Sequence, residues 1–260
     1  MKYTTGDWYD TPLYYDIIFD TDTEKECDFL EVMRQRYCLT RGKRVLEPAC
    51  GSGRLLAGMA RRGYDVTGLD LSPNMVNFAR QRLEKEKLRG RVDTAAMQDF
   101  RYPKPFDLAH CLISTFKYLL TEEDARAHLQ CVANALKPGG IYVLGFHLSD
   151  YSDTRKSRER WTGKRGNVEV VCNIQGWPAD PRTRLEKTRS RLIVHRNGQT
   201  LRHETVWYFR TYDAAQVRSL LRSVPDFEHI ATYDFTYNPD EPRDLDDDQL
   251  DTILILRKKG

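Results

Sequence analysis

Apolar residues recur along this chain at two alternating spacings, and the change from one spacing to the other predicts short strands followed by amphipathic helices. The apolar run from Val45 to Ala49 leads into the turn Gly51-Ser52-Gly53, after which Leu55, Leu56 and Met59 recur at helical spacing. This order predicts a strand, a tight glycine turn and a helix. The glycines allow positive φ angles and the close approach of a ligand, and the start of the helix presents free N–H groups to the same space.

The same alternation continues on both sides of this turn. It predicts helices over residues 23–38, 72–88 and 121–137, and strands over residues 64–69, 91–96, 107–114 and 141–146. Strands that alternate with helices in this way are typical of the α/β class. We therefore predict a doubly wound, mostly parallel sheet of seven strands. A helix over residues 213–222 and a final hairpin of strands over residues 227–237 and 252–256 are expected to complete it.

An antiparallel insertion is expected after the fifth strand. Residues 151–166 are polar and basic and are expected to form a loop, whereas residues 168–174, 184–195 and 200–210 predict three strands, the last two joined by the turn Arg196-Asn197-Gly198-Gln199. We predict a core made of residues 1–150 and 211–260, with residues 151–210 as an antiparallel β cap. The aromatic segment 1–22 is expected either to pack as an arm or to close as a lid over the ligand.

Composition excludes several classes of function. The 260 residues contain 41 Lys and Arg against 38 Asp and Glu, for a formal net charge of +3, so the net charge gives no case for nucleic acid or an anionic membrane as a partner. Six cysteines are scattered without metal-ligand spacing, and no apolar run approaches the length of a membrane span. We expect a reduced cytoplasmic protein without a metal site or a membrane contact.

One acid points to an adenosine ligand. Asp70 ends the second predicted strand about twenty residues after the glycine turn, where a carboxylate can accept hydrogen bonds from both ribose hydroxyls. The same spacing suits a nicotinamide cofactor. However, the third glycine of that fingerprint would fall at Leu56, and the first strand contains the acid Glu47. The sequence therefore favours a different adenosine.

Four segments in order, VLEPACGSG, VTGLDLSPNMVNFAR, FDLAHCLISTFKYL and ALKPGGIYVL, resemble the motifs of the class I S-adenosylmethionine-dependent methyltransferases over nearly the whole chain. The N-terminal segment and the insertion are similar to the subgroup that methylates small molecules, which includes sugar-amine and glycine-type N-methyltransferases. This resemblance implies S-adenosylmethionine as cofactor and S-adenosylhomocysteine as product. It also implies in-line transfer of the methyl group to a nitrogen or oxygen of a small acceptor, with the insertion capping the site or building a homodimer contact.

The resemblance also implies a set of cofactor contacts. Glu47, Gly51 and Gly53 would line the methionine and ribose, Asp70 the ribose diol, Leu71 and Met75 the adenine ring, and Met97 the adenine edge. The remaining expected contacts are Tyr14 or Tyr15, Ala49, Cys50, Arg54, Gln98 and Cys111.

Three positions in or next to this set are open to a second interpretation. Ala49 replaces the first glycine of the family, which the turn tolerates if φ is negative there. Ala96 replaces a common adenine-binding aspartate, so Gln98 or Asp99 would take over that contact. Arg54 is expected either to meet the methionine carboxylate or to be exposed in the first turn of the helix.

The acceptor is expected where the fourth and fifth strands end. Ser114, Thr115 and Tyr118 follow the fourth strand and His147 follows the fifth, and we expect Tyr118 and His147 to be catalytic, although a lone histidine is also common as a structural residue. On the cap, His203, Trp207 and Arg210 could close over a small acceptor, with Trp207 also open to a core role. Because His203 and Trp207 share a strand face and Arg210 lies on the other, all three cannot line the pocket.

Two alternatives remain open. Residues 155–165 are basic and surround Trp161, a pattern that would suit a nucleic-acid methyltransferase. Against this alternative, the fourth strand ends in Ile-Ser-Thr-Phe and not in the Asn/Asp-Pro-Pro-Tyr of enzymes that methylate exocyclic base amines. The third alternative is a protein that binds S-adenosylmethionine without turnover.

Overall fold

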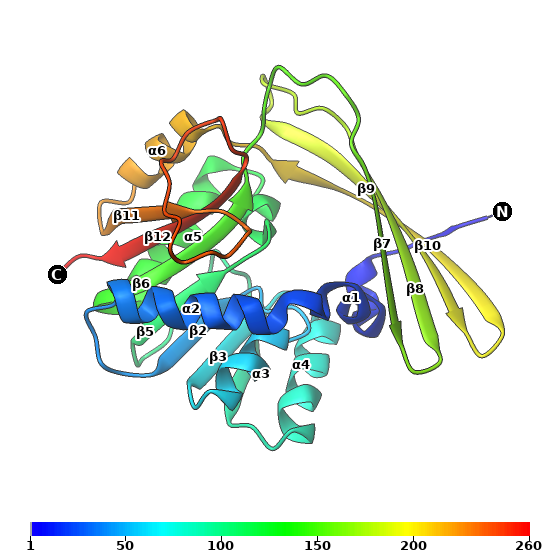
Figure 1. The fold of residues 1–260 in the computed structure, drawn as a ribbon, viewed down its shortest axis with the longest axis horizontal. Coiled ribbons are helices and arrows are strands. Elements are labelled where there is room, and N and C mark those ends of the chain that lie inside the picture. Colours follow the sequence, from blue (N-terminus) through cyan, green and yellow to red (C-terminus); the bar gives the residue numbers. More distant parts are fainter. Residues whose placement is uncertain (1) are drawn as a thin grey trace.

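The computed structural model of this protein describes residues 2–260, which form two β-sheets with an N-terminal helical segment between them (Figure 1). The main sheet has seven strands in the order β11-β12-β6-β5-β2-β3-β4. Its strands are β2 (Arg44–Pro48), β3 (Asp65–Asp70), β4 (Gly90–Thr94), β5 (Phe106–Cys111), β6 (Leu136–His147), β11 (Phe227–Tyr233) and β12 (Asp251–Lys258). Strands β2 to β6 pair in parallel, whereas β12 is antiparallel to both of its neighbours. The predicted α/β class and the seven-stranded, mostly parallel sheet are therefore confirmed.

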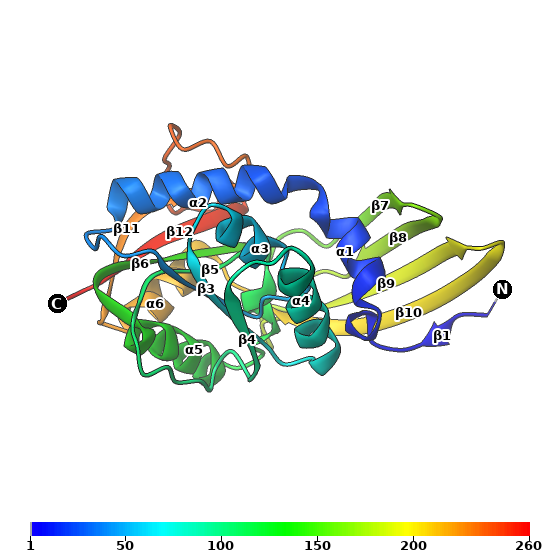
Figure 2. The ribbon, with the colours of Figure 1, turned by 90° about the horizontal axis from the view of Figure 1, so that it is seen from below.

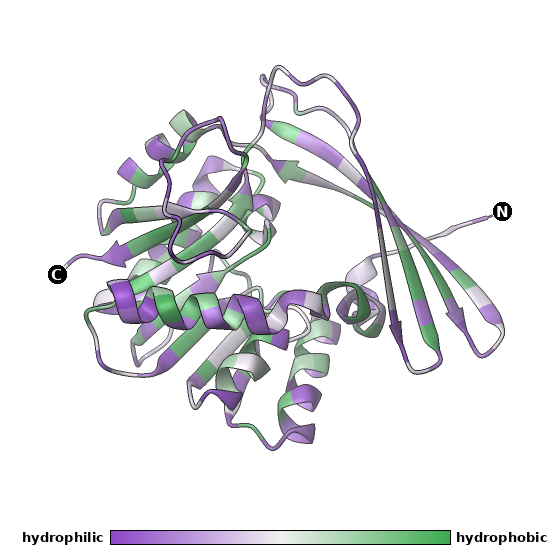
Figure 3. Cartoon of the chain, viewed as in Figure 1, coloured by the Kyte–Doolittle hydropathy of each residue, from purple (hydrophilic) through white to green (hydrophobic). Residues whose placement is uncertain are grey.

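Helices cover both faces of the main sheet (Figure 2). The apolar sides of α2 (Thr23–Tyr37), α3 (Arg54–Arg61) and α4 (Pro73–Lys85) pack on one face, and those of α5 (Glu122–Ala135) and α6 (Ala214–Arg222) on the other. Strand β5 is buried at all six of its positions, as a central parallel strand between two helical layers should be. Figure 3 shows the corresponding pattern, with hydrophobic residues concentrated on the main sheet and mixed with hydrophilic ones on the helices.

The order of the strands places a ligand site near the centre of the sheet. Within the main sheet, the chain forms β2 first and then moves outward through β3 and β4. It then returns to the other side of β2 to form β5 and β6. The connections after β2 and β5 therefore leave the sheet in opposite directions. Open α/β sheets bind ligands in the crevice at such a point, beyond the carboxyl ends of the strands.

The second sheet is the cap, in the order β1-β10-β9-β8-β7. Its strands are β1 (Thr4–Thr5), β7 (Arg158–Arg165), β8 (Val168–Gly176), β9 (Leu185–Arg196) and β10 (Gln199–Arg210). The predicted turn between the last two is present, with φ of 51° at Asn197 and 75° at Gly198, the two positive angles that a type I′ hairpin requires.

Several predicted boundaries are wrong. Residues 158–165, expected within a basic loop, form β7 and pair with β8 along their whole length. Charged side chains conceal this strand in the sequence because it lies at the edge of the sheet, where charge protects against further pairing. Residues 137–140, expected to end a helix, lie inside β6, because α5 already ends at Ala135. Strand β5 ends at Cys111 because Ile113 and Ser114 have positive φ angles.

The N-terminal segment joins the cap to the core. It comprises the short 3-10 helices η1 (Trp8–Asp10) and η2 (Asp20–Asp22) and, between them, α1 (Pro12–Phe19). A Cβ atom at Gly163 of β7 would lie 2.4 Å from the carbonyl oxygen of Ile17, so α1 contacts the backbone of β7 directly. Within the described residues no helix is long and apolar enough to cross a membrane.

Candidate active site

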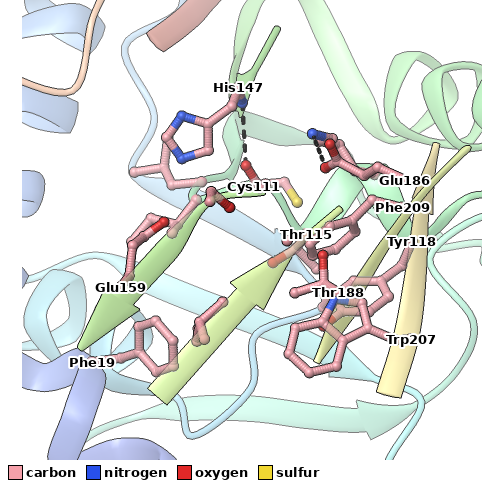
Figure 4. A pocket seen from close by; sticks show the side chains of 18 of the residues that line it. Phe19, Cys111, Thr115, Tyr118, His147, Glu159, Glu186, Thr188, Trp207 and Phe209 are labelled. Atoms are coloured by element: carbon pink, nitrogen blue, oxygen red, sulfur yellow. Dashed lines mark hydrogen bonds and ion pairs between the residues drawn. The ribbon is translucent and has the colours of Figure 1, made fainter. Parts of the chain in front are cut away.

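A cavity of about 500 Å³ lies where the ends of β2 and β5 meet the N-terminal segment and the cap (Figure 4). Its core side includes the glycine turn, residues 111–115 at and after the end of β5 with Lys117 and Tyr118, and His147 at the end of β6. The N-terminal segment contributes four aromatic residues, and the inner face of the cap sheet closes the cavity from the other side. The site therefore needs all three parts of the chain.

The glycine turn has the geometry of a ligand-binding loop, with one correction. Gly51 and Gly53 have φ angles of 54° and 71°, as expected, but φ at Ala49 is 55°, so the prediction of a negative angle there is wrong. A left-handed alanine costs about 1–2 kcal/mol, and such strain is common at ligand sites. A Cβ at Gly51 would meet only Tyr15, at 3.8 Å, whereas one at Gly53 would lie 2.7 Å from Ala79. A Cβ at Gly51 would therefore make only an ordinary contact with Tyr15, whereas Gly53 allows α3 to pack closely on α4.

Asp70 supports this turn. Its carboxylate accepts hydrogen bonds from the backbone N–H of Gly51 at 2.8 Å and of Ser72 at 2.9 Å. Burial raises the pKa of Asp70, and these backbone hydrogen bonds oppose that rise. The expected adenosine contacts lie near Asp70, beyond the walls of the cavity. Leu71 is 72% exposed, Met75 is fully buried, Met97 is nearly so, and Gln98 is half-buried.

Below the turn, Glu47 lies next to a histidine that the sequence did not single out. His110 of β5 is fully buried, and its Nδ1 lies 4.0 Å from the Glu47 carboxylate. Both His110 nitrogens and one Glu47 oxygen have no hydrogen-bond partner within residues 2–260. Burial raises the pKa of Glu47, against the opposing effect of Arg54, and lowers the pKa of His110 to about 3, so both groups favour their neutral forms. His110 escaped notice because it is one polar residue inside a buried apolar strand.

Arg54 is buried, so the expectation of an exposed first-turn arginine is wrong. Its guanidinium lines the cavity, pairs with the buried carboxylate of Glu26 and donates to the Thr23 hydroxyl at 3.1 Å. Of the two candidate tyrosines, Tyr15 lines the cavity, and burial raises the pKa of its hydroxyl. Tyr14 instead packs in the apolar cluster between α1 and the cap. Cys50 and Cys111 also line the cavity, and burial raises the pKa of both thiols.

The segment after β5 forms another wall of the cavity. The Tyr9 hydroxyl donates to that of Tyr118 at 2.9 Å, and burial raises the pKa of Tyr118. Trp207 of the cap stacks on Trp8 with ring centroids 4.7 Å apart, and the indole N–H of Trp207 has no partner within the described chain. Trp207 is thus part of the cavity wall. The other two cap residues singled out in the sequence, His203 and Arg210, do not line the cavity.

His147 lies at the rim, with 49% of its side chain exposed. Its Nδ1 lies 2.7 Å from the Asp251 carboxylate, and its backbone N–H donates to the Ser114 hydroxyl at 3.2 Å. The hydrogen bond from His147 lowers the pKa of Asp251. If the Nδ1 hydrogen faces Asp251, Nε2 is left free to accept a proton.

Charged residues that the sequence analysis did not assign to the site complete the walls of the cavity, most of them on the cap. Lys117 donates to Glu186 of β9 at 2.8 Å, and Glu159 of β7 lies on the opposite side (Figure 4). Alternation along β7 and β9 predicts which residues of each strand share a face. It does not predict which of the two faces covers the site. The acidic lining residues are Glu47, Asp150, Asp153, Glu159, Glu186 and Asp251, and the basic ones are Arg54, Lys117 and Arg155. Even with Glu47 neutral, the five other acids outnumber the three basic residues, each of which is already ion-paired, so carboxylates are in excess in the cavity lining.

Comparisons with known proteins agree with this geometry. The family described as "Methyltransferase domain" matches residues 45–140. A protein named as a methyltransferase from Geobacillus sp. (strain WCH70) is 23% identical over 80% of this chain and 83% of its own length. The dTDP-3-amino-3,4,6-trideoxy-alpha-D-glucopyranose N,N-dimethyltransferase of Streptomyces venezuelae is 32% identical over 45% of this chain, and the match spans 47% of that relative.

The fold is shared along the whole chain. The crystal structure of an S-adenosylmethionine-dependent methyltransferase from Clostridium acetobutylicum ATCC 824 superimposes with a TM-score of 0.78 at 17% identity. The superposition covers 98% of this chain and 100% of that one, including the cap.

Proposed function

Because residues 45–140 are a methyltransferase domain, we propose that this protein transfers a methyl group from S-adenosylmethionine to an amine nitrogen of a small molecule. The observation that supports this proposal is the lining of the cavity, which combines an excess of carboxylates with nine aromatic side chains. These are Trp8, Tyr9, Tyr15, Phe19, Tyr118, Trp161, Trp177, Trp207 and Phe209.

The residues present fit the cofactor. The open face of Gly51 and the unpartnered oxygen of Glu47 offer space and a hydrogen-bond acceptor for the methionine amino group, while Arg54 and Tyr15 offer donors for its carboxylate. Asp70, with its pose already set by backbone N–H groups, would hold the ribose, next to the exposed side chain of Leu71. When bound, S-adenosylmethionine supplies a methyl carbon activated by its sulfonium, so the C–S bond breaks as the N–C bond forms and its electron pair stays on sulfur.

The chain's own residues would exclude water from the cavity and orient the acceptor. The stacked rings of Trp8 and Trp207 and the hydrogen-bonded hydroxyls of Tyr9 and Tyr118 form one wall of the cavity. A wall of this kind holds an acceptor at near-attack distance without presenting a competing nucleophile.

An amine suits this cavity better than a neutral alcohol. An ammonium group is attracted to aromatic faces and to unpaired carboxylates, and Glu159 makes no ion pair within residues 2–260. An ammonium has no free electron pair, so its proton must leave before the nitrogen can attack. His147 Nε2 would accept that proton, directly or through a water, while Asp251 holds the ring. The Streptomyces relative named above is an N,N-dimethyltransferase by its name, which agrees with an amine acceptor.

Calorimetry with S-adenosylhomocysteine tests the cofactor site. We expect both Gly51→Val and Asp70→Ala to weaken binding strongly. Gly51→Val places a side chain where the cofactor would lie, and Asp70→Ala removes both the acceptor for the ribose hydroxyls and the hydrogen bond to the Gly51 N–H. NAD should not bind. If both variants bind as tightly as the parent, or if NAD binds tightly, the site is misassigned.

A matched pair of acceptors tests the amine assignment. Methyl transfer from labelled S-adenosylmethionine is measured with trans-4-aminocyclohexanol and with trans-1,4-cyclohexanediol, which differ only in the reacting group. We expect label on the amine alone, and faster transfer to the diol would contradict the proposal.

The basic segment 155–165 provides the only argument for the nucleic-acid alternative. Because residues 158–165 of this segment form strand β7 and Arg155 is paired with Asp153 at 2.9 Å, we do not expect it to bind RNA. A mobility-shift titration across salt concentrations decides this, and tight binding with a steep salt dependence would favour the alternative.

A further inference from the structure

Glu47 and His110 are buried polar neighbours that do not form a hydrogen bond with each other. Residues 45–46 of β2 lie beside residues 108–109 of β5, so the next step of this parallel register places Glu47 beside His110, on the same face of the sheet. The His110 Nδ1 lies 4.0 Å from the Glu47 carboxyl, too far for a hydrogen bond, and neither ring nitrogen has a partner within residues 2–260. A fully buried imidazole without a partner costs free energy, which is explained if its hydrogen bond forms only when Glu47 is charged.

The neighbouring strands flank this pair with apolar groups. Glu47 pairs on its other side with Gly68 of β3, where a Cβ would lie 2.4 Å from Leu56, so Leu56 already fills that flank. His110 pairs on its far side with Val143 of β6. Glu47 lines the cavity, whereas His110 does not. An effect of His110 on a bound ligand must therefore pass through Glu47.

An ammonium group in the cavity would change the charge of Glu47. Burial favours the neutral form of both Glu47 and His110, but an ammonium placed against Glu47 favours the carboxylate. Arg54 and the ammonium both disfavour an imidazolium, so the proton leaves for the solvent and does not move to His110. The neutral imidazole then has an N–H to donate to the new carboxylate, after a movement of about 1 Å.

We propose that His110 is a positioning residue for the cofactor, whose Nδ1–H donates a hydrogen bond to Glu47 once this carboxyl has ionised to bind the amino group, so that each cofactor bound releases a proton. This inference rests on the function proposed above, because it needs the methionine amino group at Glu47. The proton leaves the Glu47 carboxyl and is taken up by the buffer. A hydrogen bond to a charged acceptor is stronger than one between neutral groups, so the imidazole acts mainly in the complex.

Other titratable groups near Glu47 are distinguishable from it. Burial raises the pKa of one tyrosine and three thiols, which therefore keep their protons near neutral pH; they are Tyr15, Cys27, Cys50 and Cys111. Glu26 is already ion-paired with Arg54. Asp70 is the main competitor, since burial raises its pKa too and it would hold the ribose. A ligand that keeps the ribose but lacks the amino group separates the two carboxyls.

The test is calorimetry at about pH 6 with S-adenosylhomocysteine and with 5′-methylthioadenosine, which lacks the amino acid part. Each ligand is measured in cacodylate and in Bis-Tris, because these buffers differ in their enthalpy of ionisation and the difference in binding enthalpy counts the protons released. We expect S-adenosylhomocysteine to release at least about half a proton more than 5′-methylthioadenosine. Its affinity should also rise by up to about tenfold per pH unit, since a carboxyl whose pKa falls on binding favours the complex as the pH rises.

Two variants test the imidazole itself. His110→Leu removes the donor, and His110→Asn keeps an amide N–H near the position of Nδ1. We expect His110→Leu to bind S-adenosylhomocysteine at least about tenfold more weakly while its affinity for 5′-methylthioadenosine changes by less than about twofold, and His110→Asn to recover most of the loss. Because His110→Leu no longer buries an unpartnered imidazole, its melting temperature without ligand should not fall.

Three results would overturn the proposal. These are a difference between the two ligands of less than about half a proton, an unchanged affinity of His110→Leu for S-adenosylhomocysteine, and an equal loss of both ligands in that variant, which would show a structural role. If His110→Leu does not fold, the proton count of the parent protein decides alone. Tight binding of S-adenosylhomocysteine without proton release would refute this inference only, whereas no binding by the parent would refute the proposed function as well.

Discussion

The buried carboxylate of Asp16 should determine how firmly the N-terminal segment holds the cap to the core. It accepts hydrogen bonds from the Ser52 hydroxyl of the glycine turn at 2.6 Å, from Arg82 of α4 at 2.5 Å and from Arg165 of β7 at 2.6 Å. The Asp16 side chain is fully buried, and that of Arg82 is 13% exposed. One side chain on α1 thus bridges the glycine turn, a core helix and the cap.

We expect Asp16→Ala to lower the free energy of unfolding by about 3–5 kcal/mol, because it leaves the buried charge of Arg82 without its partner. At 2–4 °C per kcal/mol for a chain of about this size, the melting temperature should fall by about 6–20 °C. Asp20→Ala is the matched control on the adjoining turn. It removes the exposed pair with Arg165, whose side chains are 41% and 42% exposed, and should cost at most about 1 kcal/mol.

Urea unfolding at neutral pH, followed by circular dichroism, measures both variants. The Asp16→Ala loss should persist at about 1 M salt, because burial protects the pair from screening, while any loss in Asp20→Ala should shrink. A cost below about 1 kcal/mol for Asp16→Ala, or one equal to that of the control, would refute the reasoning.

Three further predictions follow from single contacts. Gly163→Ala should weaken the binding of S-adenosylhomocysteine in calorimetry, because its Cβ would lie 2.4 Å from a carbonyl oxygen of α1. The control Gly6→Ala, whose Cβ would have no atom within 4 Å, should not weaken it, and equal affinities of the two variants would show that α1 does not hold the cofactor site closed. Burial alone would raise the pKa of Asp107, but hydrogen bonds, first from Lys137, hold it below the usual value. A group whose pKa is lowered in the folded state contributes stability at pH values above its unfolded pKa, near 4, and that stability is lost as the pH falls through the folded pKa. In urea unfolding, the loss of stability in Asp107→Asn should therefore be full at pH 7 and vanish at low pH, and a loss independent of pH would contradict this. His147→Ala should leave the affinity for S-adenosylhomocysteine nearly unchanged while lowering kcat by about 100-fold, the scale of general base catalysis, and loss of folding instead would show a structural role.

Local chemistry made much of this fold predictable. The change from strand to helix spacing around Gly51 and Gly53, the start of α4 at Ser72 and Pro73, and the Asn197-Gly198 turn depend on neighbours within a few residues, and all three are present as predicted. Because such interactions are short in sequence, a pattern of residue types carries them. The α/β class and the position of the site at the ends of the parallel strands followed from that pattern.

The errors arose where the surroundings overrode local preference. The charged strand β7 lies at a sheet edge, so it lacks the alternation of a half-buried strand. Ala49 adopts a positive φ that its side chain disfavours, and Arg54, polar and in a first turn, is buried against Glu26. In each case contacts from elsewhere in the fold outweigh an intrinsic preference of about 1–2 kcal/mol.

The sequence by itself determined the class of fold, the glycine turn and the acid at Asp70, because each is encoded by neighbouring residues. Only the tertiary structure decided that Tyr15 and not Tyr14 lines the cavity, that His110 faces Glu47, and that Asp16 meets Arg165, 149 residues away. Those contacts depend on the order of the strands and on how the cap lies against the core. The free energy of such contacts comes from burying residues that are far apart in the chain, and periodicity within a single segment does not encode which segment it will meet.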